Sequence, residues 1–203
     1  MKLKILATGS SGNCYLLITE HGTLILDAGI PFLDIKRGLD YDLGMVSGVL
    51  ISHSHADHSK SLNDIKDLFP IFAPYTQGEV EIDKRSFGNF EVSCFDLPHN
   101  GTWNNGFLIK ADGQKALYMT DFEYCKYRFK KQAVNHMIIE CNYQNEYVNR
   151  DLANYEHKIR GHCSLDTCMG FIRENMTSQL RTITIIHMGV GTCNPKECVE
   201  SRE

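Results

Sequence analysis

The chain has 203 residues, of which 42% are hydrophobic and 23% are charged, and this composition is typical of a globular protein that buries a core. Its formal net charge of -4 at pH 7 excludes a generally basic protein, so nucleic acid is expected to bind only through a local patch. The polar segment TGSSGN interrupts the N-terminal apolar runs and no run of about 18 apolar residues occurs, so we expect a cytoplasmic protein without membrane contact, with a single domain over residues 1–203.

Short apolar stretches predict strands in the first half of the chain, over residues 2–6, 14–18, 22–29, 48–52 and 71–75. The first two flank the glycine-rich segment ATGSSGN. Apolar residues at helical spacing predict helices over residues 31–39 and 59–69. The expected strand over residues 48–52 leads directly into a cluster of histidines.

The second half of the chain continues this pattern. Residues 106–121 predict a β-hairpin, because two apolar runs flank the turn sequence Asp112-Gly113. Ser164 can cap a helix that ends near residue 175. Further strands are expected over residues 90–97, 136–141 and 182–188. Many strands without regular strand–helix alternation favour two sheets with helices outside them over a doubly wound parallel sheet.

The stretch ISHSHADHSK at residues 51–60 concentrates metal-ligand chemistry at the end of an expected strand. In an extended chain His53 and His55 point the same way, while Asp57 and His58 follow at the turn into the next helix. Imidazole and carboxylate together suit zinc, and also manganese or iron. Four ligands on two local faces predict two metal ions rather than one, and a solvated histidine-rich turn is the alternative.

A centre with two metal ions needs ligands from elsewhere in the chain. Candidate residues stand at the ends of four expected strands, namely Asp27, His99, Asp121 and His187. Each of these residues alone is more often a cap, a turn residue or a buried histidine. Together with the histidine cluster, they favour a metal centre assembled from several strand ends.

The motif His-x-His-x-Asp-His after an apolar strand, followed by these residues in this order, resembles the metallo-β-lactamase fold of hydrolases. The segments ATGSSGNCYLL and LILDAGI look like its YycJ-like branch, whose members are described as DNA exonucleases. The resemblance spans about residues 3–187. It implies an α/β fold, an αββα sandwich of two mixed sheets flanked by helices, with the site at one edge of the sheets. Dimers are common among such relatives, which favours a homodimer.

The resemblance also implies how the ligands are divided between the ions. The two sets would be His53, His55 and His99 for one ion and Asp57, His58 and His187 for the other. Asp121 would bridge the two ions together with a water or hydroxide, and Asp27 would hold a ligand or the histidine loop through hydrogen bonds. Lactamases typically carry cysteine in place of Asp121, and the chain shows no secretion signal, so antibiotic degradation is not expected.

Two further stretches resemble ribonuclease Z-type phosphodiesterases, in which a glutamate pairs with a histidine. IIECN places Glu140 at a strand end, and RGHCSLDTC places His162 just before a helix. Glu140 can orient the imidazole of His162 and keep it cationic, so that it contacts phosphate or protonates the leaving oxygen. Glu140 and His162 are therefore expected to be catalytic, and Asp57 of the histidine cluster is the third expected catalytic residue. The alternatives are a buried hydrogen bond for Glu140 and a purely structural place at a helix start for His162.

Substrate contacts are expected from two other segments. The segment CKYRFKK at residues 125–131 presents Lys126, Arg128 and Lys130 between aromatic rings, which suits phosphates and stacked bases, and a solvated surface is the alternative. Trp103, the only tryptophan, follows His99 closely and is either a platform at a pocket mouth or part of the core.

Together these features predict a metal-dependent hydrolase of phosphodiester bonds with two divalent ions, zinc being expected and manganese or iron the alternatives. The expected substrate is DNA or RNA. Because the tail after His187 is shorter than we expect for the YycJ-like branch, a phosphodiesterase for cyclic nucleotides is the alternative, and a metal-binding module of this fold that does not cleave nucleic acid is the second. The cysteines are expected to be idle thiols, with one further metal site as the alternative, from Cys163, Cys168, Cys193 and Cys198.

Overall fold

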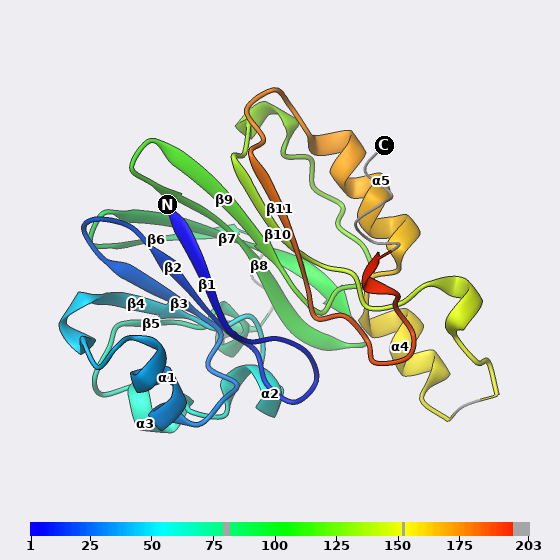
Figure 1. Cartoon of the computed structure of the whole chain (residues 1–203), viewed down its shortest axis with the longest axis horizontal. Helices are drawn as coiled ribbons and strands as arrows, with labels where there is room; N and C mark the ends of the chain where they lie inside the picture. Colours follow the sequence, from blue (N-terminus) through cyan, green and yellow to red (C-terminus); the bar gives the residue numbers. More distant parts are fainter. Residues whose placement is uncertain (79–81, 152, 197–203) are drawn as a thin grey trace.

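The computed structural model describes residues 1–78, 82–151 and 153–196, and it places two β-sheets face to face with helices on both outer sides (Figure 1). Each sheet is mixed, because it contains both antiparallel and parallel strand pairs. The αββα sandwich expected from the sequence is confirmed. Within the described ranges, no helix is long and apolar enough to cross a membrane.

The first sheet has five strands in the order β1-β2-β3-β4-β5. Their bounds are β1 Lys2–Ala7, β2 Cys14–Ile18, β3 Thr23–Leu26, β4 Val46–Leu50 and β5 Ile71–Phe72. The first three strands are antiparallel, whereas β3, β4 and β5 are parallel neighbours. Parallel neighbours point their carboxyl ends to one edge, and there the backbone N–H of Asp27 donates to the carbonyl of Leu50 at 2.8 Å.

The second sheet has six strands in the order β11-β10-β9-β8-β7-β6. Their bounds are β6 Ile82–Phe87, β7 Phe90–His99, β8 Thr102–Ala111, β9 Gln114–Met119, β10 His136–Glu140 and β11 Thr182–Ile186. The strands β9, β10 and β11 are parallel, with Ile139 opposite Met119 and Glu140 opposite Ile186. These three strands therefore end at the same level of the sheet.

Strand alternation divides the apolar residues between an inner core and two outer ones. In β8, Phe107 and Ile109 belong to the core between the sheets, while Leu108 faces the outer layer. Ile172 packs into that outer layer from α5, and Ile35 packs from α1 onto the other sheet. Figure 1 shows α1 and α3 beside the first sheet and α5 beside the second.

The helices are short. Their bounds are α1 Phe32–Gly38, α2 Ala56–Ser59, α3 Leu62–Ile65, α4 Tyr155–Gly161 and α5 Leu165–Asn175. Single 3-10 turns are η1 Leu43–Met45, η2 Pro74–Gln77, η3 Lys130–Gln132 and η4 Asn145–Tyr147. The predicted cap of α5 is confirmed, since Ser164 Oγ accepts a hydrogen bond from the backbone N–H of Thr167 at 3.1 Å.

The continuous helix expected over residues 59–69 is wrong, because tertiary hydrogen bonds interrupt it at Ser61. The carbonyl of Asp57, which a regular helix would pair with the Ser61 N–H, accepts from the backbone N–H of Asn13 at 2.7 Å. The Ser61 N–H donates instead to the carbonyl of Ala28 at 2.9 Å, and the Ser61 hydroxyl donates to the carbonyl of Ile30 at 2.5 Å. The chain therefore forms α2 and α3 as separate short turns.

The predicted hairpin is confirmed. Ala111 lies opposite Gln114, and the two turn residues Asp112 and Gly113 have positive φ values of 51° and 69°, as a two-residue type I′ turn requires. The elements β6 and α4 were not predicted from the sequence. Both are short elements with exposed or intermediate residues along most of their length, so their apolar periodicity is weak.

We predict that Gly29→Ala destabilises the fold, because a Cβ at Gly29 would lie 1.6 Å from the carbonyl oxygen of Asp57. The expected loss in the free energy of unfolding is about 1–3 kcal/mol or more. Gly170→Ala is the matched control, since nothing lies within 4 Å of its Cβ, and in an exposed helix position it should stabilise by about 0.5–1 kcal/mol. Urea unfolding of both variants tests this, and a wild-type midpoint for Gly29→Ala would contradict it.

Candidate metal centre

The candidate metal centre lies at the edge of the sandwich where strands of both sheets end. The expected ligands from outside the histidine cluster come from three strands, His99 from the end of β7, Asp121 from just after β9 and His187 from just after β11. The histidine cluster itself follows β4 and continues into α2. The structure therefore brings together residues that are up to 134 positions apart, as for His53 and His187.

Three of the residues at this edge have strained backbones. Asp27, Asp121 and His187 have φ values of 57°, 51° and 50°, a conformation that residues other than glycine rarely adopt. A positive φ ends an extended strand, which explains why the strands expected to reach residues 29 and 188 stop at residues 26 and 186. Residues with strained backbones are frequent at functional sites, where the surrounding structure holds them in the unfavourable conformation.

Three imidazole rings, from His53, His55 and His99, converge in the first part of the centre. Nδ1 of His55 lies 3.0 Å from Nε2 of His53 and 3.2 Å from Nε2 of His99. Burial lowers the pKa of all three histidines, that of His99 to about 4, so the rings are neutral near pH 7. Nδ1 of His99 donates to the carbonyl of Gly161 at 2.5 Å, which leaves its Nε2 lone pair facing the other rings.

The second part of the centre contains His58 and His187 between two carboxylates. Nε2 of His58 lies 3.4 Å from Oδ2 of Asp57 and 3.3 Å from Oδ1 of Asp121. Nε2 of His187 lies 3.7 Å and 3.6 Å from the same two oxygens. The other oxygen of Asp121, Oδ2, lies 4.0 Å from Nε2 of His53 in the first part. Asp121 thus stands between the two sets and offers one oxygen to each.

Opposite charges balance one another in this second part. Burial by itself lowers the pKa of His58 and His187, but nearby carboxylates, Asp121 foremost, raise both, that of His187 to about 10. Burial likewise raises the pKa of Asp57 and Asp121, but the histidines hold both well below their usual range. Protons on the histidines can therefore balance the carboxylates, and a divalent cation can supply the same positive charge.

Asp27 is fully buried behind His58. Its Oδ2 accepts hydrogen bonds from Nδ1 of His58 at 2.7 Å and from the hydroxyl of Tyr118 at 2.5 Å. Its Oδ1 accepts from the backbone N–H of Ser52 at 2.8 Å, at the start of the histidine loop. A carboxylate behind a ligating histidine fixes the tautomer and the orientation of the ring, so this geometry suits the supporting role expected for Asp27.

Glu140 and His162 lie beside the second part of the centre. Oε1 of Glu140 accepts from Nδ1 of His162 at 2.7 Å and from Nδ1 of His187 at 2.9 Å. Oε2 accepts from the backbone N–H groups of Phe122 and Cys163, both at 3.1 Å. Burial lowers the pKa of His162, but the charge of Glu140 raises it above its ordinary value. With Nδ1 held, His162 has Nε2 left for another partner.

These residues fit a divalent metal ion. Nε2 of His187 is buried and has no hydrogen-bond partner within the described part of the chain, although oxygens of Asp57 and Asp121 lie close by. A buried polar atom without a partner is unfavourable, and ligation of a metal at this nitrogen would remove that penalty. Nitrogen and carboxylate donors without sulfur suit zinc, manganese and iron.

Asparagines that the sequence analysis missed hold the ligand-bearing turns. Nδ2 of Asn104 donates to the carbonyls of Thr120 and Asp121 at 2.9 Å and 2.6 Å. Nδ2 of Asn142 donates to the carbonyl of His187 at 3.0 Å. Both asparagines therefore brace a residue with positive φ. The only signal in the sequence was the position of Asn142 directly after the strand end IIEC, and nothing marked Asn104.

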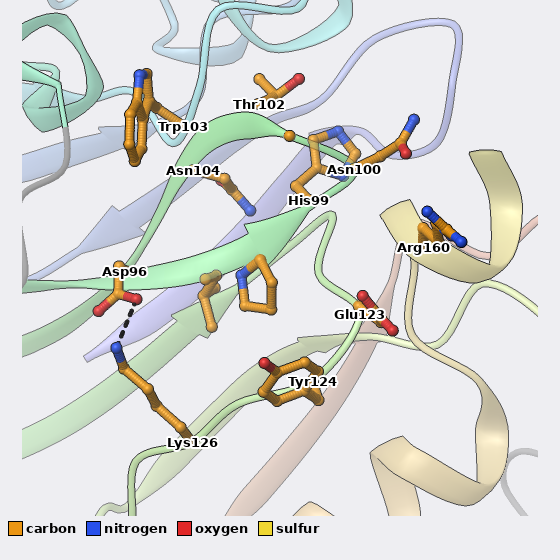
Figure 2. A pocket seen from close by; sticks show the side chains of 13 residues that line it. Asp96, His99, Asn100, Thr102, Trp103, Asn104, Glu123, Tyr124, Lys126 and Arg160 are labelled. Atoms are coloured by element: carbon orange, nitrogen blue, oxygen red, sulfur yellow. Dashed lines mark ion pairs between the residues drawn. The ribbon is translucent and has the colours of Figure 1, made fainter. Parts of the chain in front are cut away.

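A cavity of about 510 Å³ opens beside His99, and Figure 2 shows the side chains that line it. Two of the expected substrate contacts, Trp103 and Lys126, belong to its lining. Trp103 is 52% exposed, which decides against its alternative as a core residue. The other two, Arg128 and Lys130, do not line this cavity. Arg128 pairs with Glu174 at 3.6 Å, and Lys130 starts the 3-10 turn η3.

The aromatic rings of the basic segment are engaged elsewhere. Phe129 is buried in the outer core, and the ring of Tyr127 packs edge-on against Phe95 at 5.6 Å. The expected row of exposed rings between cations is therefore wrong. The alternative cysteine site also gains no support, because no group of three potential ligand atoms among the described residues includes a cysteine, and Cys198 lies outside those residues.

Comparison with known proteins agrees with this arrangement. Residues 7–125, more than half of the chain, match the sequence profile of the family described as the metallo-beta-lactamase superfamily. Exodeoxyribonuclease YycJ from Bacillus anthracis is 23% identical over 97% of this chain and 85% of its own length. The metallo-beta-lactamase fold protein YhfI from Bacillus subtilis has a TM-score of 0.72 at 15% identity, covering 98% of this chain and 89% of YhfI. The short form of human tRNase Z has a TM-score of 0.64 at 14% identity, covering 93% of each chain.

We expect the zinc-loaded protein to retain two ions per chain, because His53, His55 and His99 form one group of donors and Asp57, His58, Asp121 and His187 form another. His55→Ala should release one ion, since it removes a nitrogen from the first set alone. His21→Ala is the control, because this exposed histidine lies in the turn between β2 and β3. Metal analysis by plasma mass spectrometry after dialysis measures the content, and one ion in the wild type or no loss in His55→Ala would contradict the expectation.

Asn104→Ala should loosen the turn that presents Asp121, because it leaves two buried carbonyls without their donor. The expected cost is about 1–3 kcal/mol in the free energy of unfolding. Metal affinity should fall by about 10–100-fold, as for other residues that support a ligand. Urea unfolding and titration against a chelating indicator measure the two effects. Wild-type affinity in a destabilised variant would show that Asn104 serves the fold and not the centre.

Proposed function

The chain belongs to the metallo-beta-lactamase superfamily, and we propose that it is a hydrolase of phosphodiester bonds that uses two divalent metal ions. One observation carries the proposal. The buried Glu140 holds His162 through Nδ1, and this same nitrogen lies 3.8 Å from Oδ2 of Asp121, the aspartate between the two sets of metal-ligand atoms. In this proposal the two sets of metal-ligand atoms provide the place for the phosphate, and His162 is the proton donor beside it.

The proposed assignment of ligands follows the two sets. His53, His55 and His99 would hold one ion, and Asp57, His58 and His187 would hold the other. Asp121, which has an oxygen near each set, would be shared. Bound divalent ions, zinc in our proposal, would polarise a phosphoryl oxygen and lower the pKa of a water molecule. Asp27 keeps His58 oriented through its hydrogen bond to Nδ1.

The proton transfer is assigned to residues of the chain. Glu140 accepts a hydrogen bond from Nδ1 of His162, so Nε2 is the nitrogen that can carry a proton to the leaving oxygen. The same carboxylate also holds His187 and two backbone N–H groups, which prevents Glu140 from turning away. A fixed donor of this kind contributes about 10²–10⁴-fold to the rate of a reaction that expels an alkoxide.

Nucleic acid is the proposed substrate. The support is the curated relative, an exodeoxyribonuclease that the chain matches over nearly its whole length. A cyclic nucleotide is the second candidate, because a cavity of about 510 Å³ beside His99 has the size of a small-ligand pocket. Both substrates contain a nucleotide phosphodiester. Assembly as a homodimer and a cytoplasmic location stay predictions.

The proposed acid is tested through the leaving group. In zinc-loaded His162→Ala we expect hydrolysis of single-stranded DNA or of a cyclic mononucleotide to fall by about 10²–10⁴-fold. Bis(p-nitrophenyl) phosphate should be cleaved at close to the wild-type rate, because p-nitrophenolate leaves without a proton. Equal losses on both kinds of substrate would overturn the role of His162. Asp57→Ala is the blank, and a wild type with two ions that cleaves none of these phosphodiesters would overturn the function.

A further inference from the structure

The cavity beside His99 has the features of a site for a flat aromatic ligand. It is formed by the tip of the β7–β8 hairpin, the segment after Asp121 and the end of α4, and its volume lies in the range of small-ligand pockets (Figure 2). Trp103 and Tyr124 line it, and each is 52% exposed. Figure 2 shows the two rings on either side of β7.

The exposure of these two rings needs a physical explanation. Among the described residues, Trp103 and Tyr124 have no ring-to-ring contact with another aromatic residue, whereas Tyr127 and Phe129 nearby pack into the core. A large apolar surface left open at a cavity is typical of a binding site. Nucleobases stack on tryptophan and tyrosine because every base offers a flat π-face.

The cavity shares a wall with the metal centre. His99 lines the cavity, and its Nε2 lies 3.2 Å from His55 in the first ligand set. Two hydrogen bonds tie α4 to the hairpin tip, one from Nδ1 of His99 to the carbonyl of Gly161 at 2.5 Å and one from the backbone N–H of Asn100 to the carbonyl of Arg160 at 3.0 Å. A ligand in the cavity therefore lies against His99, one of the proposed metal ligands.

The charges of the cavity favour a base over a second phosphate. Its two cations already have carboxylate partners, Lys126 with Asp96 at 2.9 Å and Arg160 with Glu156 at 3.2 Å. The lining contains two carboxylates, Asp96 and Glu123, beside these two cations, so the cavity has little net positive charge to attract an additional phosphate. Stacking is then the main interaction that the cavity can offer.

We propose that this cavity is a nucleobase subsite, which holds the base of the nucleotide whose phosphodiester lies at the metal centre. Trp103 is its principal stacking surface and Tyr124 a second one. The inference rests on the proposed function for the meaning of the neighbouring centre. Binding of a base can nevertheless be measured without any hydrolysis.

The single tryptophan makes the test specific, because all tryptophan fluorescence of the protein comes from Trp103. The zinc-loaded chain is titrated with deoxyadenosine 5′-monophosphate and, separately, with 2-deoxyribose 5-phosphate, which has the same sugar and phosphate without the base. We expect saturable quenching by the nucleotide and none by the sugar phosphate. No quenching, or the same quenching by both ligands, would overturn the subsite.

A pair of variants separates the cavity from the rest of the surface. Tyr124→Ala should weaken binding of the nucleotide by about 5- to 150-fold, the range found when a ring that stacks on a base is removed. Tyr41→Ala should leave it unchanged, because Tyr41 is 62% exposed and does not line the cavity. Unchanged affinity in Tyr124→Ala would remove Tyr124 from the subsite and contradict the proposal as stated.

A kinetic comparison distinguishes this inference from the proposed function. Trp103→Ala should raise KM for single-stranded DNA by about 5- to 150-fold. It should leave KM unchanged for an oligonucleotide with abasic terminal sites, which has no base to stack. Trp103→Phe should restore most of the loss. If the wild type cleaves DNA but Trp103→Ala retains its KM, the subsite is wrong and the function stands. If the nucleotide quenches Trp103 but no phosphodiester is cleaved, the function is wrong and the subsite stands.

Discussion

The neutralisation of buried carboxylates at one edge of the sandwich is the constraint on which the rest of the site depends. Asp27, Asp121 and Glu140 are each at most 2% exposed, and a carboxylate without partners in such a place is strongly unfavourable. Asp27 and Glu140 accept hydrogen bonds from Nδ1 of His58 and of His187, and Nε2 of both histidines faces Asp121. Charge balance, ring orientation and metal-ligand geometry therefore depend on one network. The loss of one member leaves its buried neighbours without their charge partner or hydrogen-bond partner.

The sandwich supplies the rigidity that this network requires. Parallel neighbours in both sheets end at the same edge, which is why residues from β4, β9, β10 and β11 meet there. Strand β7 adds His99, because it is antiparallel to β8 and therefore runs in the same direction as β9. The turns that present Asp121 and His187 have positive φ and are braced by the side chains of Asn104 and Asn142. The same edge carries the cavity with Trp103, so a fixed distance separates the proposed base and phosphate positions. A site of this kind is preorganised by the fold rather than assembled around its ligand.

The parts of the structure that were predictable from the sequence are those that local patterns encode. The His-x-His-x-Asp-His cluster, the Asp112-Gly113 hairpin and the Ser164 cap each depend on a few adjacent residues, and the fold followed from them and from the resemblance. Tertiary contacts decided the rest. Hydrogen bonds from Ser61 to a distant loop interrupted an otherwise regular helical pattern, and packing against Phe95 took Tyr127 out of a surface that its sequence context favoured. A single domain over the whole chain stays a prediction.

X-ray absorption at the zinc edge of the zinc-loaded protein tests the central claim most directly. The account predicts a first shell of nitrogen and oxygen only, with zinc–nitrogen distances of about 2.0–2.1 Å, imidazole scattering from histidine ligands and a zinc–zinc path of about 3.5–4 Å. A single isolated zinc without a metal–metal path would contradict the two-ion centre. Sulfur in the first shell would contradict the ligand assignment, because no cysteine among the described residues belongs to the ligand sets.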